Sequence, residues 1–242
     1  MANTCRTALI AVIALCLVVA APALAEDENE QPLKLEQLPA AVKAAIQKEI
    51  GATQPDEIEK KTAKDGKVVY EVEWHTDTIR AEAAFGEDGK LLSRTVVTRP
   101  EKVDVDKLPE SVRKALVDSG GKDVRSVVKQ SRNDKVFYKA EWKADGREVE
   151  VVLGADGKVL AKAEELPADQ LPEAVKTSVK KELGENKVAE AERITRGDSV
   201  VYKVEWKTDG KEAAAVFAAD GKLLSREAAD DDDDDGEGED DD

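Results

Sequence analysis

The pentapeptide Tyr70-Glu71-Val72-Glu73-Trp74 returns twice along the chain, as Tyr138-Lys139-Ala140-Glu141-Trp142 and as Tyr202-Lys203-Val204-Glu205-Trp206. The three copies hold every tyrosine and every tryptophan of the 242-residue sequence. Successive copies begin 68 and 64 residues apart. Repetition at such a period indicates tandem copies of one small domain, and it argues against a single large enzyme fold.

A helix is predicted ahead of each copy. Each unit opens with a Leu-Pro pair, and proline suits a helix start because its missing N–H would be unpaired there. In the first unit, apolar residues then follow at every fourth position, which forms one stripe on a helix. These residues are Leu38, Val42, Ile46 and Ile50. Glycines stand where the three helices should end, at Gly51, Gly120 and Gly184.

Four strands are predicted after each helix. Alternation places the tyrosine and tryptophan of each pentapeptide on one strand face and the charged residues on the other. Asp88-Gly89, Asp156-Gly157 and Asp220-Gly221 each place a turn glycine fifteen residues after the tryptophan. Turns at matching positions in three copies predict an antiparallel meander. The fold class is therefore α+β, with three tandem domains that each pack one helix on a four-stranded antiparallel sheet.

The domain boundaries follow from these landmarks. We expect a signal peptide at 1–25, a linker at 26–36, domains at 37–96, 107–162 and 170–228, and a disordered acidic tail at 229–242. The connections near 98–106 and 162–169 are short, charged and contain proline. They predict a chain of three domains with limited contact between neighbours.

The first 25 residues have the pattern of a secretory signal. Arg6 is their only charge, an apolar run follows, and Ala23-Leu24-Ala25 offers a cleavage site before Glu26. We expect export to the periplasm or the extracellular space, without stable membrane insertion after cleavage. An uncleaved anchor is the alternative. Both cysteines, Cys5 and Cys16, lie in this segment, so the mature chain has no thiol chemistry and no disulfides.

The formal charge of −16 is concentrated at the C-terminus, where residues 230–242 hold eleven acidic and no basic side chains. Nucleic acid is excluded as a partner because phosphate contacts need clustered Lys and Arg. Asp231, Asp233 and Asp235 formally match a calcium-loop spacing, but a dense acidic run matches by chance and the twelfth position is Asp242 rather than glutamate. A tail that binds calcium or other cations loosely, or that only solubilises the chain, is the better interpretation. No cofactor is expected elsewhere.

A helix that opens Leu-Pro, a Tyr-x-Val-Glu strand and a closing Asp-Gly-Lys-(Leu/Val)-Leu strand together resemble the PepSY-like family, described as beta-lactamase-inhibitor-like. The resemblance covers 37–94, 107–161 and 170–226. It implies an exported bacterial module without catalytic activity. PepSY domains are thought to restrain peptidases, and beta-lactamase inhibitor protein blocks its enzyme by surface contact. This chain lacks that inhibitor's disulfides, and no inhibitory residue carries over.

Each candidate site has a structural alternative. Tyr70, Trp74, Tyr138, Trp142, Tyr202 and Trp206 are the residues of a possible binding face. Their favoured interpretation is the core beneath the helix, with the tryptophans near a sheet edge. His75 is the only histidine, and Lys143 and Lys207 at its equivalent positions indicate a surface site. Glu71 and Glu73 are interpreted as an outer, solvated strand face.

Two functions remain open. In the first, the chain is a non-enzymatic module that binds an envelope protein of unknown identity, such as a peptidase or other hydrolase held in check, and the repeats add by avidity. In the second, the poly-Asp tail binds cations or polycations and the repeats are its carrier. An enzyme is not expected, because the sequence has no catalytic triad, phosphate loop or His/Cys cluster.

Overall fold

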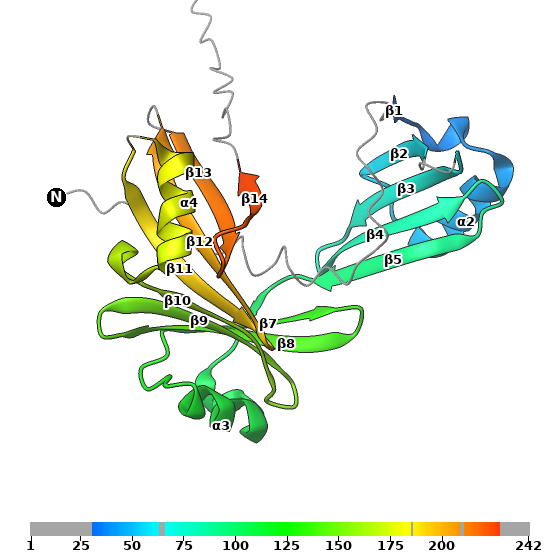
Figure 1. Cartoon of the computed structure of the whole chain (residues 1–242). Helices are drawn as coiled ribbons and strands as arrows, with labels where there is room; N and C mark the ends of the chain where they lie inside the picture. The colour runs from blue at the N-terminus through cyan, green and yellow to red at the C-terminus, as the bar shows by residue number, and fades with distance from the viewer. Residues whose placement is uncertain (1–30, 63–65, 185, 209–210, 228–242) are drawn as a thin grey trace, which may run out of the picture. The chain divides into compact units, whose positions relative to one another are not determined.

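The computed structural model describes residues 31–62, 66–184, 186–208 and 211–227. The predicted signal peptide and acidic tail lie outside these residues. The chain divides into two compact units, the first reaching Lys102 and including Val128–Phe137, and the second holding Val103–Val127 and everything from Tyr138. The fold is α+β, with three α-helices and mostly antiparallel strands in the described residues (Figure 1).

The first unit contains repeat 1 and the tip of a hairpin from repeat 2. Its elements are β1 (Gln31–Pro32), a 3-10 turn at Leu35–Gln37, α2 (Ala40–Ile50), β2 (Glu57–Thr62), β3 (Val68–His75), β4 (Ile79–Gly86), β5 (Leu91–Thr98), β6 (Glu101–Lys102) and the adjoining parts of β7 (Ser126–Arg132) and β8 (Lys135–Ala144). Strand β5 pairs with β7 through Val97 and Arg132. The predicted connection at 98–106 is thus partly ordered, and Thr98 O accepts a 2.9 Å hydrogen bond from Gln130 Nε2.

The second unit contains most of repeat 2 and all of the described part of repeat 3. Its elements are a 3-10 turn at Val105–Lys107, α3 (Glu110–Asp118), the rest of β7 and β8, β9 (Arg147–Gly154), β10 (Val159–Glu165), a 3-10 turn at Ala168–Gln170, α4 (Glu173–Leu183), β11 (Val188–Arg196), β12 (Ser199–Thr208), β13 (Lys211–Ala218) and β14 (Leu223–Glu227). The strands from β8 to β14 are neighbours in chain order.

The two repeats of the second unit share one sheet. Strand β10 of repeat 2 pairs with β11 of repeat 3, from Lys162 opposite Thr195 to Glu165 opposite Glu192. The expectation of limited contact between neighbouring domains is therefore wrong for these two repeats, because the predicted connection at 162–169 begins inside a paired strand. The finer expectation of a separate four-stranded sheet for each repeat is not confirmed.

The helices begin immediately after the predicted prolines. Pro39 and Pro172 are the N-caps of α2 and α4, and their carbonyls accept 2.9 Å hydrogen bonds from Lys43 N and Lys176 N. The apolar stripe of α4 packs on the aromatic side of its sheet, against Trp206, Phe217 and the small residues between them (Figure 1). This burial supplies the main stabilisation of each helix, since helices of eleven residues are marginal alone.

Each helix also rests on a turn glycine. A Cβ on Gly89, Gly157 or Gly221 would lie 2.6, 2.5 or 2.5 Å from the carbonyl oxygen of Ala41, Ser111 or Ala174, which are in the first turns of α2, α3 and α4. All three glycines also have positive φ, between 77° and 85°. The Asp-Gly pairs of the sequence therefore fix two things at once, the hairpin turn and the close approach of the helix.

A pair of glycine substitutions separates these two requirements. Gly146 has φ +81° and open space within 4 Å of the position that a Cβ would take, whereas Gly157 has φ +83° and the Ser111 contact. We expect Gly146→Ala to lower the free energy of unfolding by about 1 kcal/mol through backbone strain alone. Gly157→Ala should cost about 1–3 kcal/mol more, because α3 must shift. Urea unfolding followed by tryptophan fluorescence measures both, and equal losses would contradict the close approach.

The shared sheet predicts that repeats 2 and 3 unfold together. Leu153 of β9 is fully buried, so Leu153→Ala should remove about 2–5 kcal/mol. Hydrogen exchange should show amides of β12 losing protection by the same free energy as amides of β9. Phe85→Ala in the first unit is the matched control and should leave β12 protected. Unchanged protection of β12 in Leu153→Ala would show that the repeats open separately.

Candidate functional site

The aromatic residues of the three pentapeptides lie in the cores. Trp74, Trp142 and Trp206 are 3%, 2% and 2% exposed, and Tyr70 and Tyr138 are also buried. Tyr202 alone is partly buried, and it packs against the repeat 3 core. The structure therefore argues against the hypothesis that these six residues form a binding face, because five of them are buried and have no surface to offer a partner.

His75 lies on the surface, as its lysine equivalents suggest. Its Nδ1 is 2.7 Å from Asp56 Oδ2, and both side chains are exposed. Among the described residues, no group of three His, Cys, Asp or Glu side chains could hold a metal ion. Asp231, Asp233 and Asp235, like the predicted cleavage site at Ala25 and Glu26, lie outside the described residues. No helix in the described part of the chain is long and apolar enough to cross a membrane.

Strand register shows that α3 and α4 cover the same face of the second unit's sheet. Lys139 and Glu150 are ion-paired and so share a face, which leaves Tyr138, Trp142 and Val149 on the other face with α3. Residues paired across neighbouring strands point to the same side of the sheet. Val149 pairs with Glu164, Glu164 with Arg193, and Arg193 with Tyr202, which lies on the side where α4 packs. None of the described helices packs on the opposite side, which we call the open face.

The open face takes the outward residues of each strand. Its central members are Lys139 and Glu141 of β8, Glu148, Glu150 and Val152 of β9, Ala161, Ala163 and Glu165 of β10, Glu190, Glu192 and Ile194 of β11, Val201, Lys203 and Glu205 of β12, and Ala214 and Val216 of β13. The repeated pattern of the pentapeptides predicts a solvated outer face. In the second unit that prediction is wrong, because Glu150, Glu192 and Lys203 are only 1%, 7% and 4% exposed.

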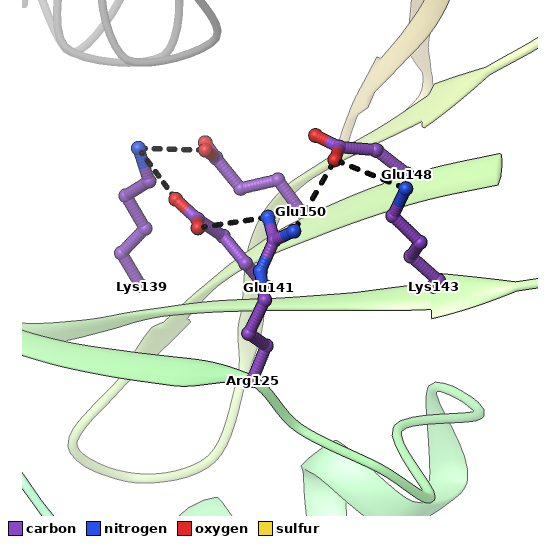
Figure 2. A network of polar contacts seen from close by, with 6 residues as sticks. All are labelled: Arg125, Lys139, Glu141, Lys143, Glu148 and Glu150. Carbon is purple, nitrogen blue, oxygen red and sulfur yellow. Dashed lines mark hydrogen bonds and ion pairs between the residues drawn. The ribbon is translucent and has the colours of Figure 1, made fainter. Parts of the chain in front are cut away.

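Glu150 is the most deeply buried charged residue of this face. Figure 2 shows it in a chain of polar contacts in which Lys139 Nζ lies 2.6 Å from Glu150 Oε2 and 3.5 Å from Glu141 Oε1. At 2.6 Å the contact with Glu150 is a close ion pair, although its angles fall outside hydrogen-bond geometry. Lys139 thus serves two carboxylates, and Glu150 is the nearer of them.

Arg125 closes the other end of the same network. Its guanidinium lies 3.7 Å from Glu141 Oε2 and 3.4 Å from Glu148 Oε1, and Lys143 Nζ lies 3.7 Å from that Glu148 oxygen (Figure 2). Arg125 and Lys143 are about half exposed, so these pairs are screened by water. Arg125 and Lys143 therefore lie at the solvent-exposed end of the network, and Lys139 is its one cation beside Glu150.

Glu192 is less well paired than Glu150. It faces Lys203 across the β11–β12 pair, but Lys203 Nζ lies 2.6 Å from Glu205 Oε1 instead. No hydrogen bond or ion pair joins Glu192 to another described residue. The contrast with the helix side is clear, because Glu164 there receives both Lys162 and Arg193.

Burial changes the protonation of these carboxyls. Desolvation raises the pKa of Glu150 to about 7, although Lys139 opposes the rise. Desolvation also raises the pKa of Glu192 to about 7; the neighbouring Glu190, Glu205 and Glu150 add to the rise, and Lys203 opposes it. Glu164 behaves oppositely, because burial alone would raise its pKa but the hydrogen bonds from Lys162 and Arg193 outweigh burial and lower it. The open face thus holds two carboxyls that titrate near neutrality.

Each unit also has a hollow among its described residues. In the first unit, a pocket of ≈ 1070 Å³ is lined by Arg80, Arg99 and Arg132 together with Glu82. Burial, Glu71 and Glu73 raise the pKa of Glu82. In the second unit, a pocket of ≈ 230 Å³ near Tyr202 is lined by the paired Glu164 and Arg193. Neither holds a nucleophile and base in contact, so neither offers a catalytic arrangement.

Sequence reasoning missed Glu150 and Glu192 as residues of interest. Period-two alternation places both on the outer face but does not say that this face is buried. A signal in the sequence was the apolar pair Ala161 and Ala163 on the outward side of β10, because the outward positions of a solvated strand are usually polar. Their burial also depends on the β10–β11 pairing, which the sequence pattern does not reveal.

Comparison with known proteins gives a family and a set of similar structures. A profile of the family described as "Putative beta-lactamase-inhibitor-like, PepSY-like" matches three times, at residues 25–93, 94–161 and 157–225. A BLIP-like protein from Bacteroides fragilis is 24% identical, with a TM-score of 0.41 over 52% of this chain and 90% of that one. A structure from Bacteroides eggerthii, described as "putative periplasmic proteins", is 15% identical, with a TM-score of 0.42 over 50% of this chain and 88% of that one. A search among curated proteins gave no match.

The raised pKa values predict a pH-dependent stability that Glu192→Gln removes. The folded protein holds a proton on Glu192 up to about pH 7, whereas an unfolded glutamate releases it near 4.5. This contribution to stability is therefore complete below pH 4.5 and is lost as pH rises through 7. Relative to the wild type, Glu192→Gln should gain about 2 kcal/mol between pH 5 and pH 8.

Urea unfolding at the two pH values measures this difference. Glu227→Gln is the control, because Glu227 is exposed on the edge strand β14. It should unfold like the wild type at both pH values. A Glu192→Gln variant that tracks the wild type from pH 5 to 8 would show that the Glu192 carboxyl is solvated and titrates normally.

Proposed function

The chain belongs to the beta-lactamase-inhibitor-like, PepSY-like family, and from that premise we propose that it is an exported, non-enzymatic protein-binding module of the cell envelope. Its partner is another envelope protein, and restraint of a peptidase or other hydrolase is the form of action that we favour. The observation that carries the proposal is the open face of the second unit, an array of charged and small apolar side chains from neighbouring strands on which no helix of the described residues packs.

The composition of this face suits a protein partner better than a small substrate. Val152, Ala161 and Ala163 are buried at its centre, so the surface that it offers a partner is set by the charged side chains around them, among them Lys139, Glu141 and Glu205. Catalysis by side chains has little support, since His75 is the only histidine, it is paired with Asp56, and no cysteine follows Cys16. Export is supported by the apolar run and the Ala23-Leu24-Ala25 site in the sequence.

The finer architecture belongs to the same proposal. We propose that the family unit is one helix and four strands, and that neighbouring units merge by edge pairing where β10 meets β11. Pairing removes two exposed strand edges, which would otherwise invite aggregation. It also widens the sheet beyond what one repeat could present to a partner.

A second function rests on the acidic tail. Residues 230–242 hold eleven carboxylates, and such a polyanion binds calcium, other cations or basic proteins without a folded site. In this alternative the repeats are a carrier. The two functions differ in which part of the chain retains the partner.

Affinity capture from the envelope extract of the native organism separates them. The baits are residues 26–242 and 26–229, each with and without calcium, and the retained proteins are identified by mass spectrometry. We expect both baits to retain the same envelope protein, independently of calcium, because the repeats make the contact. The affinity of that protein is then measured with purified components.

If only the longer bait retains basic proteins or metal ions, the acidic tail is the functional part of the chain. Retention of no specific protein by either bait would overturn the binding-module proposal. If a retained hydrolase keeps its full activity at a saturating concentration of the chain, the binding proposal stands and the proposal of restraint is contradicted.

A further inference from the structure

The pocket of the first unit lies on the side of the sheet that faces away from α2. Helix α2 packs in one core with Tyr70, Val72 and Trp74 of β3. Glu73 and His75 alternate with these residues along the strand, so they point to the other side, where they line the pocket. Every lining residue belongs to the first unit. The pocket of ≈ 1070 Å³ is therefore a hollow on one face of one sheet.

Strand register sorts the charges of this pocket into two neighbouring rows. Glu57, Glu73 and Glu82 pair in succession across β2, β3 and β4 and form an acidic row. Two residues along from Glu73 on β3, a second row begins and runs to β7. Its members are His75, Arg80, Val97 and Arg132. Rows that are two residues apart along a strand are separated by about 7 Å. The pocket thus presents negative charge along one row and positive charge along the next.

Part of this charge is neutralised within the pocket. His75 Nδ1 lies 2.7 Å from Asp56 Oδ2, and Arg80 Nη2 lies 3.6 Å from Glu73 Oε2. Four charged lining groups remain, and no ion pair or side-chain hydrogen bond joins any of them to another described residue. They are Glu57, Glu82, Arg99 and Arg132. Each is exposed or half-buried, so a partner can reach it.

The four remaining groups are separated by sign. Glu57 and Glu82, which we call the acidic end, stand on β2 and β4. Arg99 and Arg132, which we call the basic end, stand directly after β5 and on β7. Neighbouring strands are about 5 Å apart, so the step from β4 across β5 to β7 spans about 10 Å. Half-buried Val97 of β5 lies between the ends and provides an apolar centre.

A segment of a protein suits this arrangement better than a metal ion or a small molecule. In an extended segment, side chains three residues apart are about 10 Å apart, which matches the distance between the ends. Guanidinium groups bind carboxylates through paired hydrogen bonds. The pocket volume of ≈ 1070 Å³ exceeds the range of about 300–1,000 Å³ that is typical of small-molecule sites. No three acidic or histidine side chains of the described residues could hold a metal ion.

We propose that this pocket binds a mixed-charge segment of the partner protein, with a lysine or arginine of the segment at the acidic end and an aspartate or glutamate at the basic end. This inference rests on the proposed function and adds a contact surface in the first unit to the open face of the second. A segment with only one sign of charge should bind weakly, because one end of the pocket repels it.

An NMR titration of the mature full-length chain with two synthetic peptides tests the pocket. The first peptide is Lys-Lys-Gly-Gly-Glu-Glu, in which the nearest opposite charges are three residues apart. The second is hexalysine, which the acidic tail attracts and the basic end repels. We expect the mixed-charge peptide to shift the amide signals of Glu82, Val97 and Arg132 at physiological salt. Hexalysine should leave these three signals unchanged.

Two substitutions at opposite ends of the pocket show whether both signs of charge take part. We expect Glu82→Gln and Arg132→Gln each to weaken binding of the mixed-charge peptide about threefold, since each removes one exposed charge contact. Arg94→Gln and Glu227→Gln are the matched controls, because both residues are exposed and neither lines the pocket. A general attraction of lysines to an acidic protein predicts the opposite for Arg132→Gln, which makes the chain more negative.

Weaker binding in both pocket variants, with both controls like the wild type, supports the inference. Binding by Arg132→Gln that equals or exceeds that of the wild type overturns it, as do shifts that miss the pocket. The urea midpoints of both variants should stay unchanged, since neither side chain has an ion pair. A lowered midpoint together with weaker binding would show a structural role instead. A Lys-Glu dipeptide that binds as tightly as the hexapeptide would make the ligand a small zwitterion and overturn the protein segment.

The captured envelope protein separates a failure of this inference from a failure of the proposed function. If the wild type and Arg94→Gln retain the protein and Arg132→Gln retains clearly less, the partner uses the pocket. Equal retention by all three chains would overturn the inference and leave the proposed function standing. Retention by none of them would overturn the proposed function itself.

Discussion

The pairing of β10 with β11 is the interaction on which the rest of the second unit depends. Four residue pairs, from Lys162–Thr195 to Glu165–Glu192, join the last strand of one repeat to the first strand of the next. The backbone hydrogen bonds of both edges are satisfied in this way, and a single sheet replaces two small ones. Domains near sixty residues bury little core alone, so the merger also adds stability where it is most needed.

The same pairing sets the sides of the sheet. The register of the β10–β11 pair keeps α3 and α4 on one side of the sheet. The strand residues that alternate with the helix-facing ones therefore all lie on the open face. A one-residue slip between β10 and β11 would exchange the two sides in repeat 3 and place α4 opposite α3. The burial of Glu150 and Glu192 on a common face is thus a consequence of one register, and the ion pairs of Glu164 on the helix side are another.

The sequence predicts the local structure well. The Leu-Pro pairs mark the helix starts, glycines mark the ends, and the pentapeptides form β3, β8 and β12 with their tryptophans inward. These features follow from backbone restrictions and from period-two or period-3.6 burial, which act over a few residues. The Asp-Gly turns are predicted for their backbone angle, and the structure adds the helix contact at Gly157 and its equivalents.

What the sequence does not predict is the joining of repeats and its effect on charge. Residues 162–169 are rich in charge and contain a proline, which is typical of a linker, yet Lys162 and Glu165 are paired strand residues. Edge pairing is decided by tertiary geometry that local patterns do not encode. For the same reason Glu82 of repeat 1 and Glu150 of repeat 2, which occupy equivalent positions after their tryptophans, differ in burial.

An engineered disulfide tests the β10–β11 register most directly, because the chain has no cysteine after Cys16. Glu164 and Arg193 are opposite each other on the helix side, so Glu164→Cys with Arg193→Cys should oxidise readily to a monomeric disulfide in the mature protein. Glu164→Cys with Arg196→Cys is the control, since those positions are out of register and should stay reduced. Oxidation of the control pair, with none in the register pair, would contradict the shared sheet and the open face derived from it.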